Sequence, residues 1–379
     1  MSRSLAKTSL LGALAFNQDG GRISPHVPVV ESLASPIWIG SGGSVGREGP
    51  IVQIGSALGS VCGQSFGLSE SRLRLLVACG AVGGISATLN APIAGVFFSL
   101  VLILRKVQTQ AFGVVVLSVT ADAIGRAAFG NHPFLSVPAF DFSLRSSLCC
   151  TRGSVLATGV GLGFVRVLYV GEDLADRLWR GPDWLRPAAG GILLGLLLRA
   201  ADVRGRLSGA GARGRRPLHD PRPFGLLAAE VLATSLTMWI GGSGGMFAPS
   251  LLIGATLGAA YGAIAHHTLP RLAAAAGAYG LVGTGAVFAA AARAPITAVL
   301  ISFELTGDYR TILPLMLGEL VGWLRHRRVL RAYHQHSSKR PWSPLAPPSG
   351  QSDLPEGRSG SPVAGSGVDV RSAWGEETV

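Results

Sequence analysis

Residues 42–59 read GGSVGREGPIVQIGSALG, and residues 241–258 read GGSGGMFAPSLLIGATLG. The two stretches share a Gly-Gly-Ser turn, a glycine two residues later, a proline, and the pairs Ile-Gly and Leu-Gly, and every shared position is offset by 199 (249 − 50). A repeat that keeps one register over this length indicates an internal duplication. We therefore expect the chain to consist of two structurally related halves.

A second repeated stretch follows the first in each half. Residues 90–93 read NAPI and residues 293–296 read RAPI, with an offset of 203 (295 − 92). Because a proline in the first turn of a helix costs no hydrogen bond, Pro92 and Pro295 predict helix starts. Hydrophobic segments that are interrupted by Gly and Pro at matching places predict a binding site between the two repeats, near the middle of the bilayer.

The composition is that of a membrane protein. Of the 379 residues 48% are hydrophobic and only 14% are charged, whereas an average soluble domain has roughly 25% charged residues. Nearly uncharged stretches cover residues 75–104, 111–128, 153–170, 188–198, 224–240, 247–265 and 274–303. Since a helix needs about 20 apolar residues to span a bilayer, we expect an all-α polytopic membrane protein with about eight to ten membrane helices.

Two basic clusters contribute to the net charge of +12. Residues 202–222 hold six arginines against two aspartates, and residues 325–340 hold six basic residues and no acidic one. Both clusters flank apolar segments, which is typical of cytoplasmic loops. The expected polyanionic partner is therefore membrane lipid, and no nucleic acid.

Arg47 and Glu48 stand beside a predicted helix start inside an apolar region. Ionisable residues are costly in a membrane and by default indicate function. Gly46 and Gly49 leave backbone N–H groups uncovered, and the first N–H groups of a helix have no partner within it. Together with the positive end of the helix dipole, these groups predict an anion site. The competing interpretation of Glu48 is an ion pair with Arg47.

The second copy of the turn, from Gly245 to Pro249, has no charged side chain. An anion there would be bound by backbone N–H groups and a helix dipole alone, which suits an ion that must also be released. Phe247 lies in this turn, although an aromatic residue in an apolar run more commonly serves packing.

Residues 40–55, GSGGSVGREGPIVQIG, and residues 242–249, GSGGMFAP, resemble two selectivity-filter motifs of the CLC family of chloride channels and transporters. The similarity extends from about residue 20 to about residue 317. The resemblance implies a CLC-type fold of two inverted repeats with discontinuous helices, a homodimer, and a place in the cell (plasma) membrane. It also implies chloride as the transported ligand, with no cofactor, no metal and no catalytic residue.

By the same resemblance, Glu48 is the external gating glutamate, whose carboxylate competes with chloride when ionised and moves away when protonated. The resemblance assigns anion binding to the backbone amides of Arg47, Glu48, Gly49, Met246, Phe247 and Ala248. The glycines and prolines that shape the two turns are Gly46, Pro50, Gly245 and Pro249.

Three features depart from the family's pattern. A Gly-Ser-Gly-Ile-Pro type segment is expected just before Leu10, where residues 4–8 read SLAKT. A tyrosine at the inner mouth is expected on a final helix, but Tyr333 stands in a basic context that does not match. The internal glutamate of proton-exchanging members aligns with Val101 and Leu102, while Glu304, in the second half, is interpreted as structural.

These features together predict chloride transport that is channel-like and voltage-gated, because the proton relay is missing. The alternatives are a proton/chloride antiporter of the same family and a truncated remnant that conducts nothing. An intramembrane enzyme with Glu48 as its base is disfavoured, since the apolar segments carry no second catalytic group. The expected organisation is a partial helix and loop over residues 1–33, a transmembrane domain over 34–320 with repeats at about 34–130 and 153–320, and a disordered tail over 325–379.

Overall fold

The computed structural model describes residues 20–104, 112–130, 144–179, 181–182, 185–200, 223–268, 274–292, 294–306, 312–322 and 324. Within these ranges the regular structure is helical, apart from one isolated antiparallel bridge between Gly46 and Gly245. The expected all-α fold is therefore confirmed. The two basic clusters, the tail, Tyr333 and residues 4–8 lie outside the described residues.

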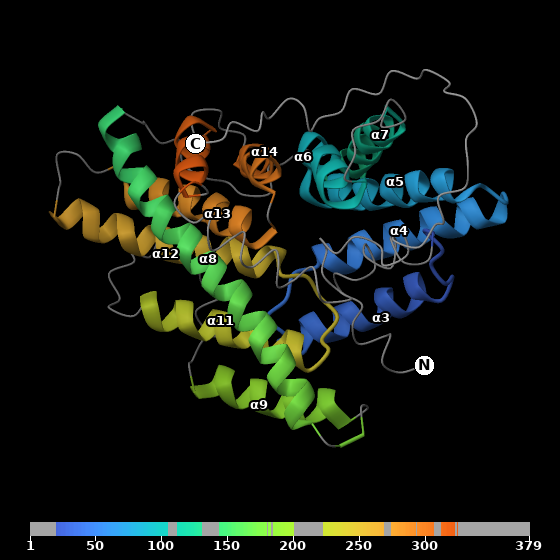
Figure 1. Cartoon of the computed structure of the whole chain (residues 1–379), viewed down its shortest axis with the longest axis horizontal. Coiled ribbons are helices and arrows are strands. Elements are labelled where there is room, and N and C mark those ends of the chain that lie inside the picture. The colour runs from blue at the N-terminus through green and yellow to red at the C-terminus, as the bar shows by residue number, and fades with distance from the viewer. Residues whose placement is uncertain are drawn as a thin grey trace, which may run out of the picture. The chain divides into compact units, whose positions relative to one another are not determined.

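The helices fall into two series that lie beside each other, from blue to teal and from green to orange (Figure 1). The first series is α3 (Val27–Gly40), α4 (Glu48–Ser65), α5 (Glu70–Leu89), α6 (Pro92–Phe98), the π-helix η1 (Ser99–Leu104) and α7 (Phe112–Phe129). The second is α8 (Leu144–Leu178), α9 (Arg186–Ala200), α11 (Pro223–Trp239), α12 (Phe247–Thr268), α13 (Ala276–Ala292), α14 (Pro295–Thr306) and a helix over Ile312–Gly322.

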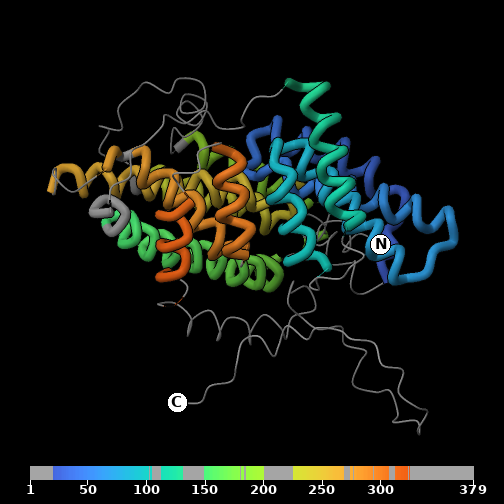
Figure 2. The backbone as a smooth tube through the Cα atoms, turned by 90° about the horizontal axis from the view of Figure 1, so that it is seen from above, coloured from blue at the N-terminus to red at the C-terminus, as the bar shows by residue number. Residues whose placement is uncertain are grey.

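The two series repeat one arrangement, as the sequence predicts. The helices α4 and α12 begin 199 positions apart, and α6 and α14 begin 203 positions apart at Pro92 and Pro295. In each series the first of these helices packs along the next one, α4 along α5 and α12 along α13. Figure 2, which turns the view by 90°, again places the two series side by side.

Helix length is the point at which the structure corrects the sequence analysis. Four described helices are long and apolar enough to span a membrane, and six further apolar helices have only 10 to 17 residues. Of the eight to ten membrane helices that we expect, four therefore reach the spanning length among the described residues, because a continuous apolar stretch can contain a break. Residues 75–104, for example, are divided among α5, α6 and η1, with Asn90 in the left-handed conformation between α5 and α6.

The expected domain boundary between residues 33 and 34 falls within a helix, and the boundary itself stays a prediction. The helix α3 begins at Val27 and has Pro28 in its first turn. Pro36 lies inside this helix, where it removes one backbone donor. The helix therefore crosses the boundary at residue 33, and α8 likewise begins before residue 153.

Close helix packing depends on glycines at repeated positions. A Cβ atom added to Gly55 of α4 would collide with the carbonyl oxygen of Gly80 in α5, and one added to Gly254 of α12 would collide with that of Gly283 in α13. Small residues allow such close approach of membrane helices. This contact explains why both pairs are kept in the repeat.

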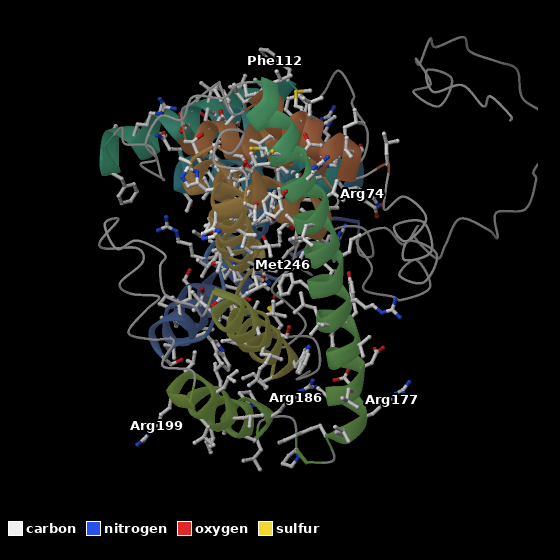
Figure 3. The ribbon with its side chains drawn as sticks, turned by 90° about the vertical axis from the view of Figure 1, so that its left-hand side faces the viewer. Arg74, Phe112, Arg177, Arg186, Arg199 and Met246 are labelled. Atoms are coloured by element: carbon white, nitrogen blue, oxygen red, sulfur yellow. The ribbon has the colours of Figure 1, made fainter. Side chains whose placement is uncertain are left out.

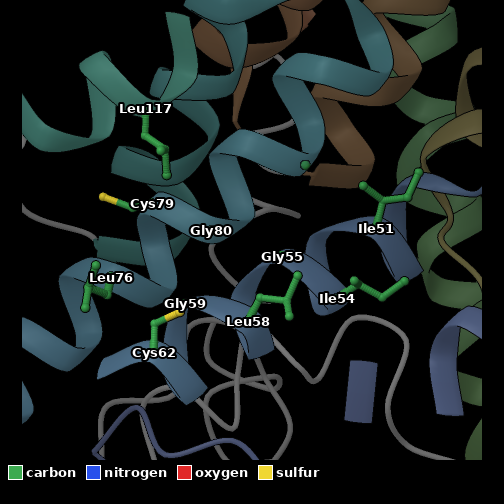
Figure 4. A pocket seen from close by; sticks show the side chains of 11 residues that line it. Ile51, Ile54, Gly55, Leu58, Gly59, Cys62, Leu76, Cys79, Gly80 and Leu117 are labelled. Carbon is green, nitrogen blue, oxygen red and sulfur yellow. The ribbon is translucent and has the colours of Figure 1, made fainter. Parts of the chain in front are cut away.

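One face of the first repeat carries an apolar groove of about 480 Å³ along α4, α5 and α7 (Figure 4). Ile54 and Leu58 line it, and Leu58 is 53% exposed. Their counterparts in the second repeat, Ile253 and Leu257, are buried in a cluster with residues of α8. Among the described residues, this face is therefore covered by a helix only in the second repeat.

Candidate functional site

The site begins with the same glycine turn in both repeats. Gly42 and Gly241 adopt positive φ angles of 102° and 84°, which only glycine adopts readily. The next residue closes the turn: the N–H of Gly43 donates to the carbonyl of Trp38, and that of Gly242 donates to the carbonyl of Thr237, both at 2.9 Å. The Gly-Gly pair thus ends α3 and α11 and directs the chain toward α4 and α12.

The two turns are joined to each other by their backbones. The N–H of Gly46 donates to the carbonyl of Gly245 at 2.7 Å, and the N–H of Gly245 donates to the carbonyl of Gly46 at 2.8 Å. The pair is antiparallel, so the two turns run in opposite directions, as an inverted repeat requires. It places the starts of α4 and α12 next to each other.

Both helices begin with backbone donors that lie outside the helical ladder. The first ladder bonds are those from Ile51 to Arg47 in α4 and from Ser250 to Met246 in α12. The residue before each, Pro50 or Pro249, has no N–H group. The N–H groups of the two preceding residues in each helix are therefore outside the ladder, and the positive ends of two helix dipoles meet beside them.

The carboxylate of Glu48 lies beside these donors. A Cβ atom added to Gly46 would meet both Oε2 of Glu48 and the backbone nitrogen of Ala248, although Oε2 itself accepts no hydrogen bond from the described residues. The residue is buried, with 6% of its surface exposed, whereas Arg47 is exposed and contributes a favourable charge interaction. Since the carboxylate is buried beside the start of α12 whereas Arg47 is exposed, a simple ion pair does not describe its environment.

The second turn contributes backbone and packing to the site. The ring of Phe247 is buried and meets Phe288 of α13 edge to face, with the ring centroids 4.6 Å apart. This contact, which the sequence analysis missed, fixes the side chain of Phe247 in the core. Its backbone N–H, like that of Ala248, remains at the start of α12.

The turn lies in the interior of the helical domain. Figure 3 shows Met246 between the ends of the domain, whereas Arg177, Arg186 and Arg199 lie toward one end and Phe112 toward the other. No group of three metal-ligating side chains occurs among the described residues.

The comparison with protein families agrees with this geometry. The model of the voltage-gated chloride channel family matches residues 11–324. The chain belongs to the CLC family. It is a multi-pass membrane protein with the CLC-type fold, as the resemblance of its motifs implied.

Named CLC relatives include both channels and exchangers. A chloride channel protein of Ralstonia nicotianae, named ClcB-like, is 37% identical over 318 residues, covering 80% of this chain and 72% of that protein. The H(+)/Cl(-) exchange transporter ClcA of Vibrio cholerae is 32% identical over 306 residues, covering 74% of this chain and 62% of that protein. A crystal structure of a slow cyanobacterial Cl⁻/H⁺ antiporter matches with a TM-score of 0.67 and 26% identity, covering 86% of this chain and 84% of that one.

The residues that depart from the CLC pattern are only partly described. Val101 and Leu102 lie in the π-helix η1, and Val101 is 40% exposed. Glu304 accepts the N–H groups of Ile93 at 2.9 Å and Ala94 at 2.6 Å, so a carboxylate of the second repeat holds the start of α6 in the first. This contact fits the structural interpretation of Glu304, which stays a prediction.

The structure brings together two further pairs that the sequence analysis missed. Ser44 contacts Glu230, and Ser243 contacts Glu31. A signal was present in the sequence, because Glu31 and Glu230 are themselves 199 positions apart, at the offset of the motif.

Proposed function

We propose that this chain transports chloride across the membrane through the site between the starts of α4 and α12, with Glu48 as its gate. The observation that carries the proposal is the place of the Glu48 carboxylate, which lies beside Gly46 together with the backbone nitrogen of Ala248. One negatively charged group thus lies next to the helix starts of both repeats. A chloride ion would use the same donors.

The gate follows from competition for these donors. When Glu48 is ionised, its carboxylate is a tethered anion that holds the N–H groups and excludes chloride. When it is protonated, the attraction to the two helix dipoles weakens and chloride takes the donors. The amides of Gly49, Met246 and Phe247 belong to the same two turns, and that of Arg47 precedes Glu48. Binding by backbone dipoles permits release of the ion, which a fixed cation would oppose.

The transport is channel-like and voltage-gated in this proposal, because Val101 and Leu102 provide no acid for an internal proton relay. The second candidate is proton-coupled chloride exchange. It is favoured by the relatives, since ClcA and the cyanobacterial protein are named an exchange transporter and an antiporter.

Liposomes that contain the purified protein distinguish these functions. We expect chloride to leave the vesicles down its gradient, with no proton uptake or release coupled to it. If the chloride gradient drives protons against their own gradient, the protein is a proton-coupled exchanger and not a channel. The protein must first elute as a single folded species. If its chloride efflux then equals that of protein-free vesicles, the result would contradict transport and support the non-conducting remnant.

The remaining properties of the proposal come from the family. We propose a homodimer in the cell membrane, with one chloride site in each subunit and membrane lipid around it. Light scattering of the detergent-solubilised protein gives the mass of the particle. A mass equal to one 39.1 kDa chain at all protein concentrations would contradict the dimer.

A further inference from the structure

Two glutamates are buried beside the anion site in positions that the gate does not use. Glu31 lies on α3 with 5% of its surface exposed, and Glu230 lies on α11 with 4% exposed. Within the described residues neither carboxylate forms an ion pair. A buried, unpaired carboxylate is costly in an apolar environment, and an intramembrane acid is by default a functional one.

Each glutamate accepts a hydrogen bond from the serine of the opposite repeat. The hydroxyl of Ser44, in the first turn, donates to Oε1 of Glu230 at 2.6 Å and also contacts Oγ1 of Thr234 at 3.0 Å. The hydroxyl of Ser243, in the second turn, donates to Oε2 of Glu31. The two serines, like the two glutamates, are 199 positions apart, so the two bonds are copies of each other.

These bonds act at the same place as the backbone pair. Each serine stands two residues before the glycine that bridges the repeats, Gly46 or Gly245. Each turn is therefore attached to the other repeat twice, once by its backbone and once by its serine. The attachments precede the donors of α4 and α12 by only a few residues, so they constrain the distance between the two helix starts.

We propose that Glu31 and Glu230 are positioning residues of the anion site, which set the separation of the two helix starts through Ser243 and Ser44 and thereby determine which anion the site prefers. This inference rests on the proposed transport of chloride. Neither glutamate contacts the anion. Each acts through the serine that it holds, and the effect reaches the backbone N–H groups of the turn.

Substitutions distinguish positioning through the hydrogen bond from an effect of the negative charge of Glu230. Gln in place of Glu230 retains an oxygen that accepts the Ser44 hydroxyl but has no charge, whereas Leu retains the size and removes the acceptor. Ser44→Ala removes the donor. A positioning role predicts that Glu230→Gln resembles the wild type, and that Glu230→Leu and Ser44→Ala have the same effect. The corresponding set for the second pair is Glu31→Gln, Glu31→Leu and Ser243→Ala.

The measurement is the ratio of nitrate to chloride flux in liposomes. A net hydrogen bond of about 1 kcal/mol corresponds to about fivefold, so we expect Glu230→Leu and Ser44→Ala to change this ratio by about three- to fivefold. Glu230→Gln should remain within about twofold of the wild type. The double variant Ser44→Ala/Glu230→Leu should change the ratio no more than the stronger single variant, because both remove one bond.

A control on another helix shows whether loss of stability alone could produce the effect. Thr158 is buried on α8, and its hydroxyl donates to the carbonyl of Ser154 within that helix at 2.9 Å. Thr158→Val should lower the melting temperature without changing the flux ratio. A ratio that is unchanged in Glu230→Leu, or one that changes equally in Glu230→Gln and Glu230→Leu, would overturn the positioning role.

Thermal unfolding keeps this inference distinct from the proposed function. Ser44→Ala, Glu230→Leu and the double variant form a double-mutant cycle, in which the melting temperature of each purified protein is measured. This measurement requires no transport. If the wild type carried no anion, the proposed function and the effect on selectivity would both be lost, yet coupling in the cycle would still show the Ser44–Glu230 bond. If the effects on melting were additive while flux was normal, the bond would be absent and this inference alone would be overturned.

Discussion

Gly46 and Gly245, 199 positions apart in the chain, exchange two backbone hydrogen bonds of 2.7 and 2.8 Å. The pair joins the two repeats where two helix starts with free backbone donors converge. The carboxylate of Glu48, at the start of α4, lies beside the backbone nitrogen of Ala248 at the start of α12. The duplication of the sequence therefore has a structural consequence, because the candidate site is formed by one turn from each copy.

The bridging glycines should not tolerate a side chain. A Cβ atom on Gly245 would lie 2.8 Å from the backbone nitrogen of Gly49, and one on Gly46 would collide with the Glu48 carboxylate. We expect Gly245→Ala to lower the free energy of unfolding by about 1–3 kcal/mol and to reduce chloride flux.

The control for this substitution is Gly163→Ala on α8, since a Cβ atom there meets nothing within 4 Å. It should leave stability equal to or above that of the wild type, as alanine favours the helix. Equal melting temperatures for the two variants would show that the turns are not in close contact.

The groove in the first repeat gives a matched pair of stability predictions. Leu257 is 4% exposed beneath α8, whereas its counterpart Leu58 is 53% exposed. Leu257→Ala should therefore lower the free energy of unfolding by about 2–5 kcal/mol. Leu58→Ala should lower it by less than about 1 kcal/mol. Denaturation of both variants under one detergent condition measures the difference, and a larger loss for Leu58→Ala would mean that another helix covers the groove.

The contact of Glu304 with the start of α6 should stabilise the assembly of the repeats. Both of its oxygens accept backbone N–H groups, and its charge faces the positive end of the helix. Glu304→Ala should cost about 0.5–2 kcal/mol of stability, and Glu304→Gln, which retains one accepting oxygen, should cost less. Flux in Glu304→Gln should keep the pH dependence of the wild type. A loss of that dependence would instead assign Glu304 to the proton chemistry of transport.

Sequence reasoning found the two helix starts of the candidate site because glycine and proline act on the backbone. The repeated Gly, Ser and Pro positions predicted helix starts after Gly46 and Gly245, and the structure begins α4 at Glu48 and α12 at Phe247. Glycine and proline restrict the local conformation directly, so their spacing indicates structure without knowledge of tertiary contacts. The family followed from the same residues.

Contacts between the repeats could not be predicted in this way. The bonds from Ser44 to Glu230 and from Ile93 and Ala94 to Glu304 join residues that are distant in sequence and close only after the repeats assemble. The lengths of the membrane helices were overestimated for a related reason, since hydropathy follows burial in the bilayer and does not report a break such as the one at Asn90. The matching offset of Glu31 and Glu230 was visible, but two isolated glutamates indicate no contact by themselves.

The central claim is that Glu48 is a tethered competitor of the transported anion, and the pH dependence of chloride flux tests it most directly. In the wild type, flux should rise as the pH falls, because protonation releases the donors of α4 and α12. Glu48→Gln, which resembles the protonated acid, should carry more chloride than the wild type at neutral pH and show no dependence on pH. A Glu48→Gln protein with the flux and the pH profile of the wild type would contradict this account.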